Sequence, residues 1–212
     1  MTLLALYNKL YKFYGPQAWW PSETPFETIV GAILTQNTSW KNVEKAIANL
    51  KKIGGLSSPL KLDKVSEKRL GRIIRPAGYY NIKAKRLKNF LRFLSSSHGG
   101  RLSGISGLDT RKLRHELLNI NGIGPETADS ILLYAFSRPV FVVDAYTKRI
   151  FSRHKFFKED TSYEEVQRVF TANLPRNSRI YNEYHALIVR LAKDFCKKKA
   201  PNCAVCPICP TP

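Results

Sequence analysis

Residues 117–135 read LLNINGIGPETADSILLYA, and this stretch decides the fold. Two apolar helical segments flank a turn that holds Gly122 and Gly124, and Pro125 opens the second segment. Glycine permits backbone angles and a close approach that a side chain would block, and proline suits a first helical position because no amide hydrogen bond is lost there. The stretch therefore predicts two helices joined by a hairpin, with free amides at the positive end of the second helix. Such amides suit a phosphate group.

A lone G-x-G pattern before a helix is a weak motif, and an ordinary tight turn between packed helices explains it equally well. A second feature lies twenty residues after Gly124, where the apolar stretch at 141–143 delivers Asp144 to the start of another predicted helix. An aspartate at this position serves as a helix N-cap or as a catalytic carboxylate, and the residues alone leave both roles open.

Apolar residues recur at helical spacing along the chain, and only the short apolar stretch at 140–143 resembles a strand. We therefore predict an all-α fold. Gly- and Pro-rich stretches separate the helical segments. The predicted helices span residues 2–14, 25–34, 40–53, 63–74, 83–95, 110–118, 125–136, 145–151, 162–174 and 180–195.

The composition indicates a folded protein with a polyanionic partner. The 212 residues carry 35 Lys and Arg against 16 Asp and Glu, a net charge of +19, and 43% of them are hydrophobic, which excludes a disordered chain. No apolar run reaches the length needed to cross a bilayer. Asn8 and Lys9 interrupt the apolar opening segment before a signal-peptide core can form. We therefore expect a cytoplasmic, nucleoid-associated protein.

All four cysteines fall near the C-terminus with the spacing C-x6-C-x2-C-x2-C. A disulfide framework would scatter cysteines along the chain, so this clustering favours a metal, although two disulfides or free thiols are the alternative. Four thiolates suit tetrahedral zinc or a four-iron four-sulfur cluster, and their number alone does not separate the two. The candidate ligands are Cys196, Cys203, Cys206 and Cys209.

Four motifs stand in an order that resembles the endonuclease III superfamily of helix-hairpin-helix DNA glycosylases, most closely its alkyl-base branch of 3-methyladenine glycosylases. They are ILTQNTSW, LNINGIGPETA, VVDAYTKRI and the terminal cysteines, and they extend from about Pro25 to Cys209. The resemblance implies two all-α lobes. Residues 22–138 would form a six-helix barrel with the hairpin, and residues 1–21 with 139–212 would form the second lobe. A monomer would hold double-stranded DNA with a damaged base.

The resemblance also implies a role for each motif. The hairpin would grip a DNA phosphate, Asp144 would help to break the glycosidic bond of a flipped nucleotide, and Gln36 would fill the gap that the base leaves. Aromatic residues near the pocket are candidates for stacking on the base, with a place in the core as their alternative. Part of the basic stretch after them is expected to line the DNA, and a solvated helix face is its alternative. The implied residues are Gly122, Gly124, Thr127 and Lys148 for DNA, Trp40, Tyr79 and Tyr80 for the base, and Lys83, Lys85, Arg86 and Lys88 in the basic stretch.

Glu126 departs from the pattern of bifunctional members, which carry a lysine that forms a Schiff base at this position. A carboxylate cannot do so, and the departure predicts a monofunctional enzyme with water as nucleophile. Together with Asp144, Glu126 would favour a positively charged base such as 3-methyladenine or 7-methylguanine; its alternative role is to favour the helix dipole. The competing hypotheses are a bifunctional endonuclease III-like glycosylase and lyase for oxidised pyrimidines, which could use Lys148, and a non-catalytic DNA-binding module.

For the cysteines, the resemblance implies a four-iron four-sulfur cluster with the family spacing C-x6-C-x2-C-x5-C. This chain keeps the first three positions and shortens the last interval to two residues. Ferredoxins hold clusters with C-x2-C-x2-C spacing, so the cluster remains the expectation and zinc the alternative. Its role would be structural, presenting Lys197, Lys198 and Lys199 to phosphate.

Overall fold

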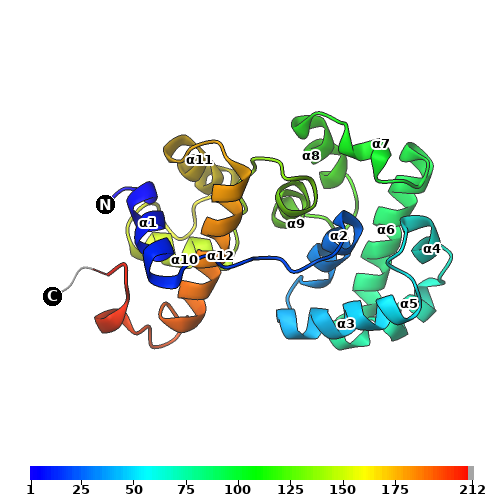
Figure 1. Ribbon diagram of the computed structural model, residues 1–212, viewed down its shortest axis with the longest axis horizontal. Coiled ribbons are helices and arrows are strands. Elements are labelled where there is room, and N and C mark those ends of the chain that lie inside the picture. The colour runs from blue at the N-terminus through cyan, green and yellow to red at the C-terminus, as the bar shows by residue number, and fades with distance from the viewer. Residues whose placement is uncertain (210–212) are drawn as a thin grey trace. The chain divides into compact units, whose positions relative to one another are not determined.

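The structure is a computed structural model that describes residues 1–209, and within them it contains helices and no strands (Figure 1). The all-α prediction is confirmed. The chain divides into two compact units. We call Ser22–Phe136 the hairpin unit, and Met1–Pro21 together with the chain from Ser137 onward the terminal unit. Among the described helices, none is both long and apolar enough to cross a membrane.

The hairpin unit is built around α2 (Pro25–Leu34), in which every residue from Phe26 to Leu34 is buried. A helix that is apolar on all sides needs neighbours on all sides, and α3, α6 and the turn η2 all pack against it. The remaining elements are α3 (Trp40–Lys52), α4 (Pro59–Asp63), α5 (Glu67–Ile73), η1 (Arg75–Ala77), α6 (Tyr80–His98), α7 (Ser103–Ser106), α8 (Thr110–Leu118), α9 (Pro125–Ser130) and η2 (Ile131–Ala135).

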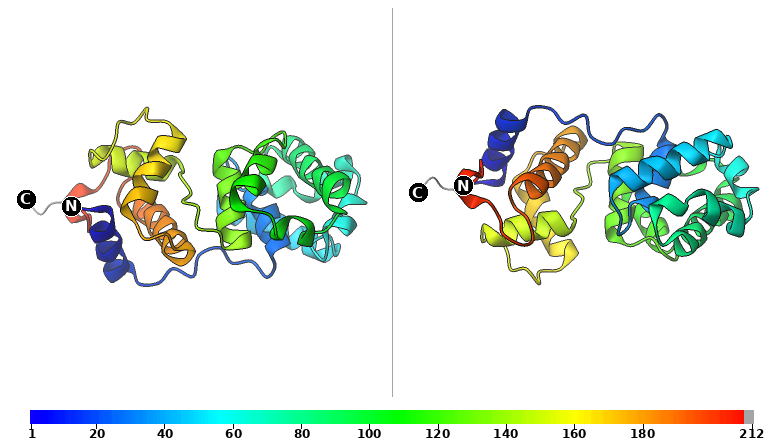
Figure 2. Two further views of the ribbon diagram at one scale, coloured as in Figure 1. Left: turned by 90° about the horizontal axis from the view of Figure 1, so that it is seen from above. Right: turned by 90° about the horizontal axis from the view of Figure 1, so that it is seen from below.

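The terminal unit contains α12 (Ser178–Asp194) between α1 (Leu3–Tyr14) and α10 (Ala145–Arg153), as Figure 2 shows. Its core is aromatic: the ring of Phe141 stacks on that of Phe170 with centroids 4.1 Å apart. The apolar stretch before Asp144 therefore belongs to this core as extended chain rather than as a strand. The other elements are α11 (Tyr163–Asn173) and η3 (Cys203–Val205).

Most predicted helices differ from the observed ones by a few residues at their ends, and α6 begins three residues earlier and ends three residues later than predicted. Two further differences have a local cause. The helix expected at 63–74 is α5 alone, because Ser66 caps a later start by accepting a hydrogen bond from the backbone amide of Arg69 at 3.4 Å. The separate helix α4, which ends at Asp63, was not predicted. The helix expected at 125–136 changes from α-helix to a π-helical turn at Ile131. Apolar periodicity continues through both breaks, which explains why it did not reveal them.

A buried ion pair joins the two helices on either side of the hairpin. Arg114 on α8 donates from Nε to Oδ1 of Asp129 on α9 at 2.7 Å and from Nη2 to Oδ2 at 3.0 Å. The Asp129 side chain is fully buried, whereas that of Arg114 is 24% exposed. The two parallel bonds fix both the spacing and the rotation of α8 against α9.

We expect the Arg114→Met variant to lose about 3 kcal/mol of unfolding free energy in urea titrations, because removal of one partner leaves the Asp129 carboxylate buried without its guanidinium. The control is Arg111→Met, on the exposed side of α8, which should change the free energy by less than about 0.5 kcal/mol. Equal effects of the two substitutions would contradict a stabilising role for the pair.

Candidate active site

The hairpin occupies residues 119–124, between the last turn of α8 and the first residue of α9. Gly122 has a φ of +96°, and a Cβ built there would lie 2.3 Å from Cγ of Arg86. Both the backbone angle and the space therefore require glycine. Gly124 is the N-cap of α9 and supplies no side chain to cap it. The hairpin has the form that the sequence predicted.

A hydrogen-bond network joins Gln36, at the end of α2, to the hairpin. The Gln36 amide nitrogen donates to the carbonyl oxygen of Gly122 at 3.0 Å and to Oγ1 of Thr127 at 2.9 Å. The guanidinium of Arg86 donates to the Gln36 amide oxygen. The structure thus brings together three of the predicted DNA-binding residues, and it adds Arg86 as the side chain that covers the glycine.

The other predicted residues of the hairpin unit are dispersed. Tyr79 is 69% exposed and has a left-handed φ of 46° just before α6, whereas Tyr80 is half-buried and lies 6.0 Å under the guanidinium of Arg75. Trp40 is half-buried at the first position of α3, and Glu126 is exposed in the first turn of α9.

The basic stretch after the tyrosines does not act as one surface. Lys83 is 1% exposed and donates to the carbonyl oxygen of Ala77 at 2.7 Å, so it does not belong to the part of the stretch that could line the DNA. Burial, helped by the charge of Arg86, lowers the pKa of Lys83 to about 8. Lys88 pairs with Asp63 at 2.9 Å, while Lys85 is exposed.

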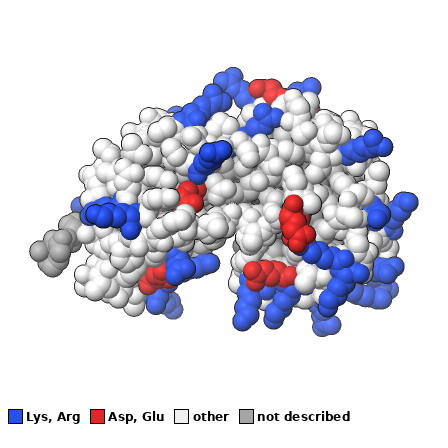
Figure 3. Space-filling model, in the orientation of Figure 1, with Lys and Arg blue, Asp and Glu red and all other residues white. Residues whose placement is uncertain are grey.

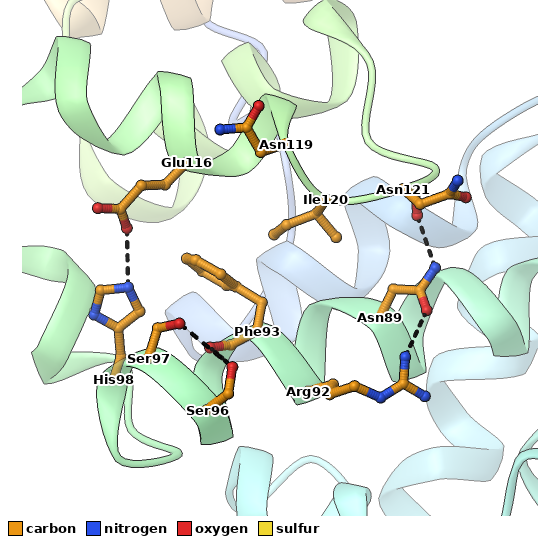
Figure 4. A pocket seen from close by; sticks show the side chains of 10 residues that line it. All are labelled: Asn89, Arg92, Phe93, Ser96, Ser97, His98, Glu116, Asn119, Ile120 and Asn121. Atoms are coloured by element: carbon orange, nitrogen blue, oxygen red, sulfur yellow. Dashed lines mark hydrogen bonds and ion pairs between the residues drawn. The ribbon is translucent and has the colours of Figure 1, made fainter.

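A pocket of about 720 Å³ lies beside the hairpin, between α6 and α8 (Figure 4). Asn89 donates from Nδ2 to the carbonyl oxygen of Asn121 in the hairpin at 2.9 Å, and Arg92 donates to Oδ1 of Asn89 at 3.1 Å. Phe93 and Ile120 form its apolar part. No motif in the sequence indicated this pocket, which places the Arg92 cation next to the hairpin.

Asp144 is the N-cap of α10, and its two carboxylate oxygens have different partners. Oδ1 accepts from the backbone amide of Thr147 at 2.7 Å and from its hydroxyl at 2.8 Å, whereas Oδ2 lies 3.4 Å from Nε2 of His185. The Asp144 side chain is 11% exposed. Burial alone would raise its pKa, but the charge of His185 and these hydrogen bonds outweigh burial and lower the pKa.

His185 and Trp19 complete this site, and the sequence did not indicate either. His185 lies on α12 with 8% of its side chain exposed, and the Trp19 ring meets its imidazole edge-on at 6.3 Å between centroids. Both residues are far from Asp144 along the chain. The packing of α12 against α10 brings His185 to Asp144.

Residues 30–176 match the family model described as HhH-GPD superfamily base excision DNA repair protein. The chain belongs to this superfamily, and it is a DNA glycosylase. It is 55% identical over 204 residues, 96% of this chain and 92% of the relative, to a Methanocaldococcus jannaschii protein named as a DNA repair glycosylase. It is 29% identical to the endonuclease III of Thermotoga maritima, covering 86% of this chain and 79% of that protein.

Two solved structures resemble this glycosylase along most of their length. The 3-methyladenine DNA glycosylase of H. pylori, bound to 1,N6-ethenoadenine, has a TM-score of 0.78 and 27% identity, and the match covers 91% of this chain and 98% of that one. An endonuclease III–DNA covalent intermediate has a TM-score of 0.82 over 97% of this chain and 92% of that one. At 22% identity, the second comparison shows the fold alone.

The cysteines of the glycosylase line one cavity of about 290 Å³ in the terminal unit. Arg153, in the last turn of α10, donates to Sγ of Cys196 at 3.3 Å and to the carbonyl oxygen of Lys197 at 2.8 Å. Burial, followed by contact with Cys206 and Cys203, raises the pKa of the Cys209 thiol to about 12. Among residues 1–209, no three His, Cys, Asp or Glu side chains converge as ligands of a single metal ion.

Lys148 is bonded within the terminal unit. It is half-buried on α10, and its Nζ donates to the carbonyl oxygen of Thr161, ahead of α11. This bond ties the lysine to its own unit.

Positive side chains are spread widely over the face shown in Figure 3, whereas acidic side chains gather in a few places.

We expect Asp144→Asn to slow base release by on the order of 1,000-fold, because the amide carries no negative charge to stabilise the sugar cation. Asparagine caps helices as well as aspartate does, so α10 and the affinity for DNA should be retained. Single-turnover release of the base, circular dichroism and a binding titration measure the three quantities.

The matched control is Asp109→Asn, because Asp109 caps α8 in the same way and is exposed. It should release the base at the wild-type rate. Full activity of the Asp144→Asn variant would show that Asp144 is a helix cap alone.

Proposed function

We propose that this DNA glycosylase is monofunctional: it flips a damaged purine out of double-stranded DNA, hydrolyses the N-glycosidic bond and leaves an abasic site. The observation that carries the proposal is the carboxylate of Glu126 at the position where bifunctional relatives need an amine. Alkylated purines such as 3-methyladenine and 7-methylguanine are the proposed substrates. The likeness to the H. pylori 3-methyladenine glycosylase supports this choice.

Asp144 is suited to the role of catalytic carboxylate. Loss of the base leaves an oxocarbenium-like sugar, which a fixed negative charge stabilises. Thr147 holds one oxygen of Asp144 with two hydrogen bonds, and the lowered pKa keeps the carboxylate ionised. The second oxygen is not used by the cap, and we assign to it the sugar and the attacking water.

The surroundings of two buried or half-buried lysines favour water over an amine as nucleophile. Lys148 is bonded to the Thr161 carbonyl, and Lys83 is enclosed in the hairpin unit against Ala77. A Schiff base needs an unprotonated amine at the sugar carbon. The alternative is a bifunctional glycosylase and lyase for oxidised pyrimidines, which the relationship to Thermotoga maritima endonuclease III favours.

DNA binding is assigned to the hairpin and to the Gln36 network. The backbone amides near Gly122 and Gly124 would hold a phosphate, and Gln36 would exchange its bonds to Gly122 and Thr127 for contacts in the gap left by the base. A net charge of +19 supports attraction to the backbone.

We further propose that the four cysteines hold a four-iron four-sulfur cluster. Thiolates suit iron–sulfur clusters and zinc alike. The four described thiols line one cavity, which supports a shared group. The cluster would serve structure, since hydrolysis transfers no electron. Arg149 and Arg153 bond the cysteine segment to α10, the helix that Asp144 caps.

The substrate prediction is tested on duplexes that carry either 7-methylguanine or thymine glycol, with strand breakage compared before and after hot alkali. We expect breakage of the methylated duplex only after alkali, because an abasic site survives until base cleaves it. Borohydride should trap no covalent enzyme–DNA product, since no amine attacks the sugar.

Breakage of the thymine glycol duplex without alkali, together with a trapped product, would contradict the proposal. It would mean that a lysine attacks in spite of Glu126. The Asp144→Asn variant serves as the control for contaminating nucleases, since both activities should be lost with it.

The cluster prediction is tested on protein purified without oxygen. We expect broad visible absorption and about four irons per chain, and we expect Cys209→Ser to lower both. The Asp144→Asn variant is the control and should keep its iron. A colourless protein with one zinc per chain would overturn the assignment.

A further inference from the structure

His185 stands where the proposed mechanism has no role for it. Its Nε2 lies 3.4 Å from Oδ2 of Asp144, the oxygen that Thr147 does not bind. Both side chains are almost completely buried, at 8% and 11% exposure. The hydrogen bonds that cap α10 all go to Oδ1 of Asp144. His185 instead lies beside Oδ2, the oxygen that we assign to the reaction.

The proton balance of the proposed reaction calls for an acceptor. When a cationic purine leaves, the electron pair of the bond between C1′ and the base neutralises the base, so the base takes up no proton. The oxygen of water bonds to C1′, and one water proton is left over. We assign the water to the Asp144 carboxylate, and the next group that can take the proton onward is the imidazole of His185, whose Nε2 lies 3.4 Å from Oδ2.

We propose that His185 is the proton acceptor of the site, receiving at Nε2, through Oδ2 of Asp144, the proton that the attacking water loses. The O–H bond of water breaks as the C1′–O bond forms, and the carboxylate is restored when the proton moves to the imidazole. The imidazolium then releases it to solvent. This inference rests on the proposed function, because a base that left as an anion would take the proton itself.

The neighbours of His185 are compatible with this role. From α10 it is faced by the Asp144 carboxylate, and from the segment before α2 by the Trp19 ring, which does not titrate. Glu183, earlier on α12, accepts from the backbone amide of Gln17 at 2.7 Å. α1 meets α12 through Tyr7, whose ring packs on that of Tyr184.

The test compares wild type, His185→Gln and His115→Gln in single-turnover release of 7-methylguanine from pH 5 to 9. Glutamine keeps a polar side chain but cannot accept the proton, and His115 is an exposed histidine of α8. We expect His185→Gln to be slower by on the order of 100-fold at neutral pH with unchanged affinity for DNA. The wild-type rate should fall toward acid. His115→Gln should keep this loss of rate at low pH, and His185→Gln should not show it.

A second measurement does not depend on activity. A carboxyl whose pKa is lowered by folding stabilises the protein above its unfolded pKa, and this contribution disappears as the pH falls through the folded pKa. Without His185 the lowering is smaller, so the acid unfolding midpoint of His185→Gln should lie at higher pH than that of wild type. His115→Gln should unfold at the wild-type pH.

The outcomes separate the two proposals. Wild type that releases no alkylated purine would overturn the proposed substrate. If wild type is active, two results for His185→Gln would overturn the role of His185 alone. These are an unchanged rate of base release, or a rate that still falls toward acid as in wild type. A slower variant whose rate still falls toward acid would mean that the histidine only supports the local packing.

Discussion

The two carboxylate oxygens of Asp144 have different partners, Thr147 at Oδ1 and His185 at Oδ2, and the terminal unit depends on this arrangement. Thr147 holds Oδ1 with a backbone amide and a hydroxyl, and these bonds start α10 at a fixed position. The last turn of the same helix holds the cysteine segment through Arg153. One helix therefore connects the proposed catalytic carboxylate to the proposed cluster. Displacement of either end would be transmitted along a rigid rod of nine residues.

In the hairpin unit, side-chain contacts hold an exposed turn in a fixed conformation. Gly122 allows Arg86 to lie directly against the backbone, and Arg86 in turn orients the amide of Gln36. The Arg114–Asp129 pair fixes the helices on either side. One backbone bond, from the Ile123 amide to the carbonyl oxygen of Ile120 at 3.0 Å, closes the turn and does not by itself hold the turn against the rest of the unit. Its support therefore comes from side chains that bind its carbonyl oxygen and its flanking helices.

The local elements of this fold could be predicted from the sequence because their causes are local. The glycines of the hairpin, Pro125 and the capping Asp144 act on residues within one turn, and the sequence displays them directly. The break at Ser66 was missed since apolar spacing continues across it. His185 could not be identified, and Arg86 was predicted only as a member of a basic stretch, because their partners are distant in the chain and only packing brings them together. The burial of Lys83 was not predicted for the same reason, as a run of basic residues does not reveal which member faces the core.

The glycosylase has to attract the negative DNA backbone and also, under the proposed function, accept a positively charged base. A chain with a net charge of +19 attracts phosphate over a long range, but the same field repels a cationic purine that has left the stack. A carboxylate can reverse the sign locally only if it remains ionised while buried, where desolvation favours its protonated form. In Asp144, the charge of His185 and the two bonds from Thr147 overcome that penalty. The cap of α10 is thus what allows a buried negative charge to exist in a basic protein, and the structural and chemical roles of Asp144 depend on the same hydrogen bonds.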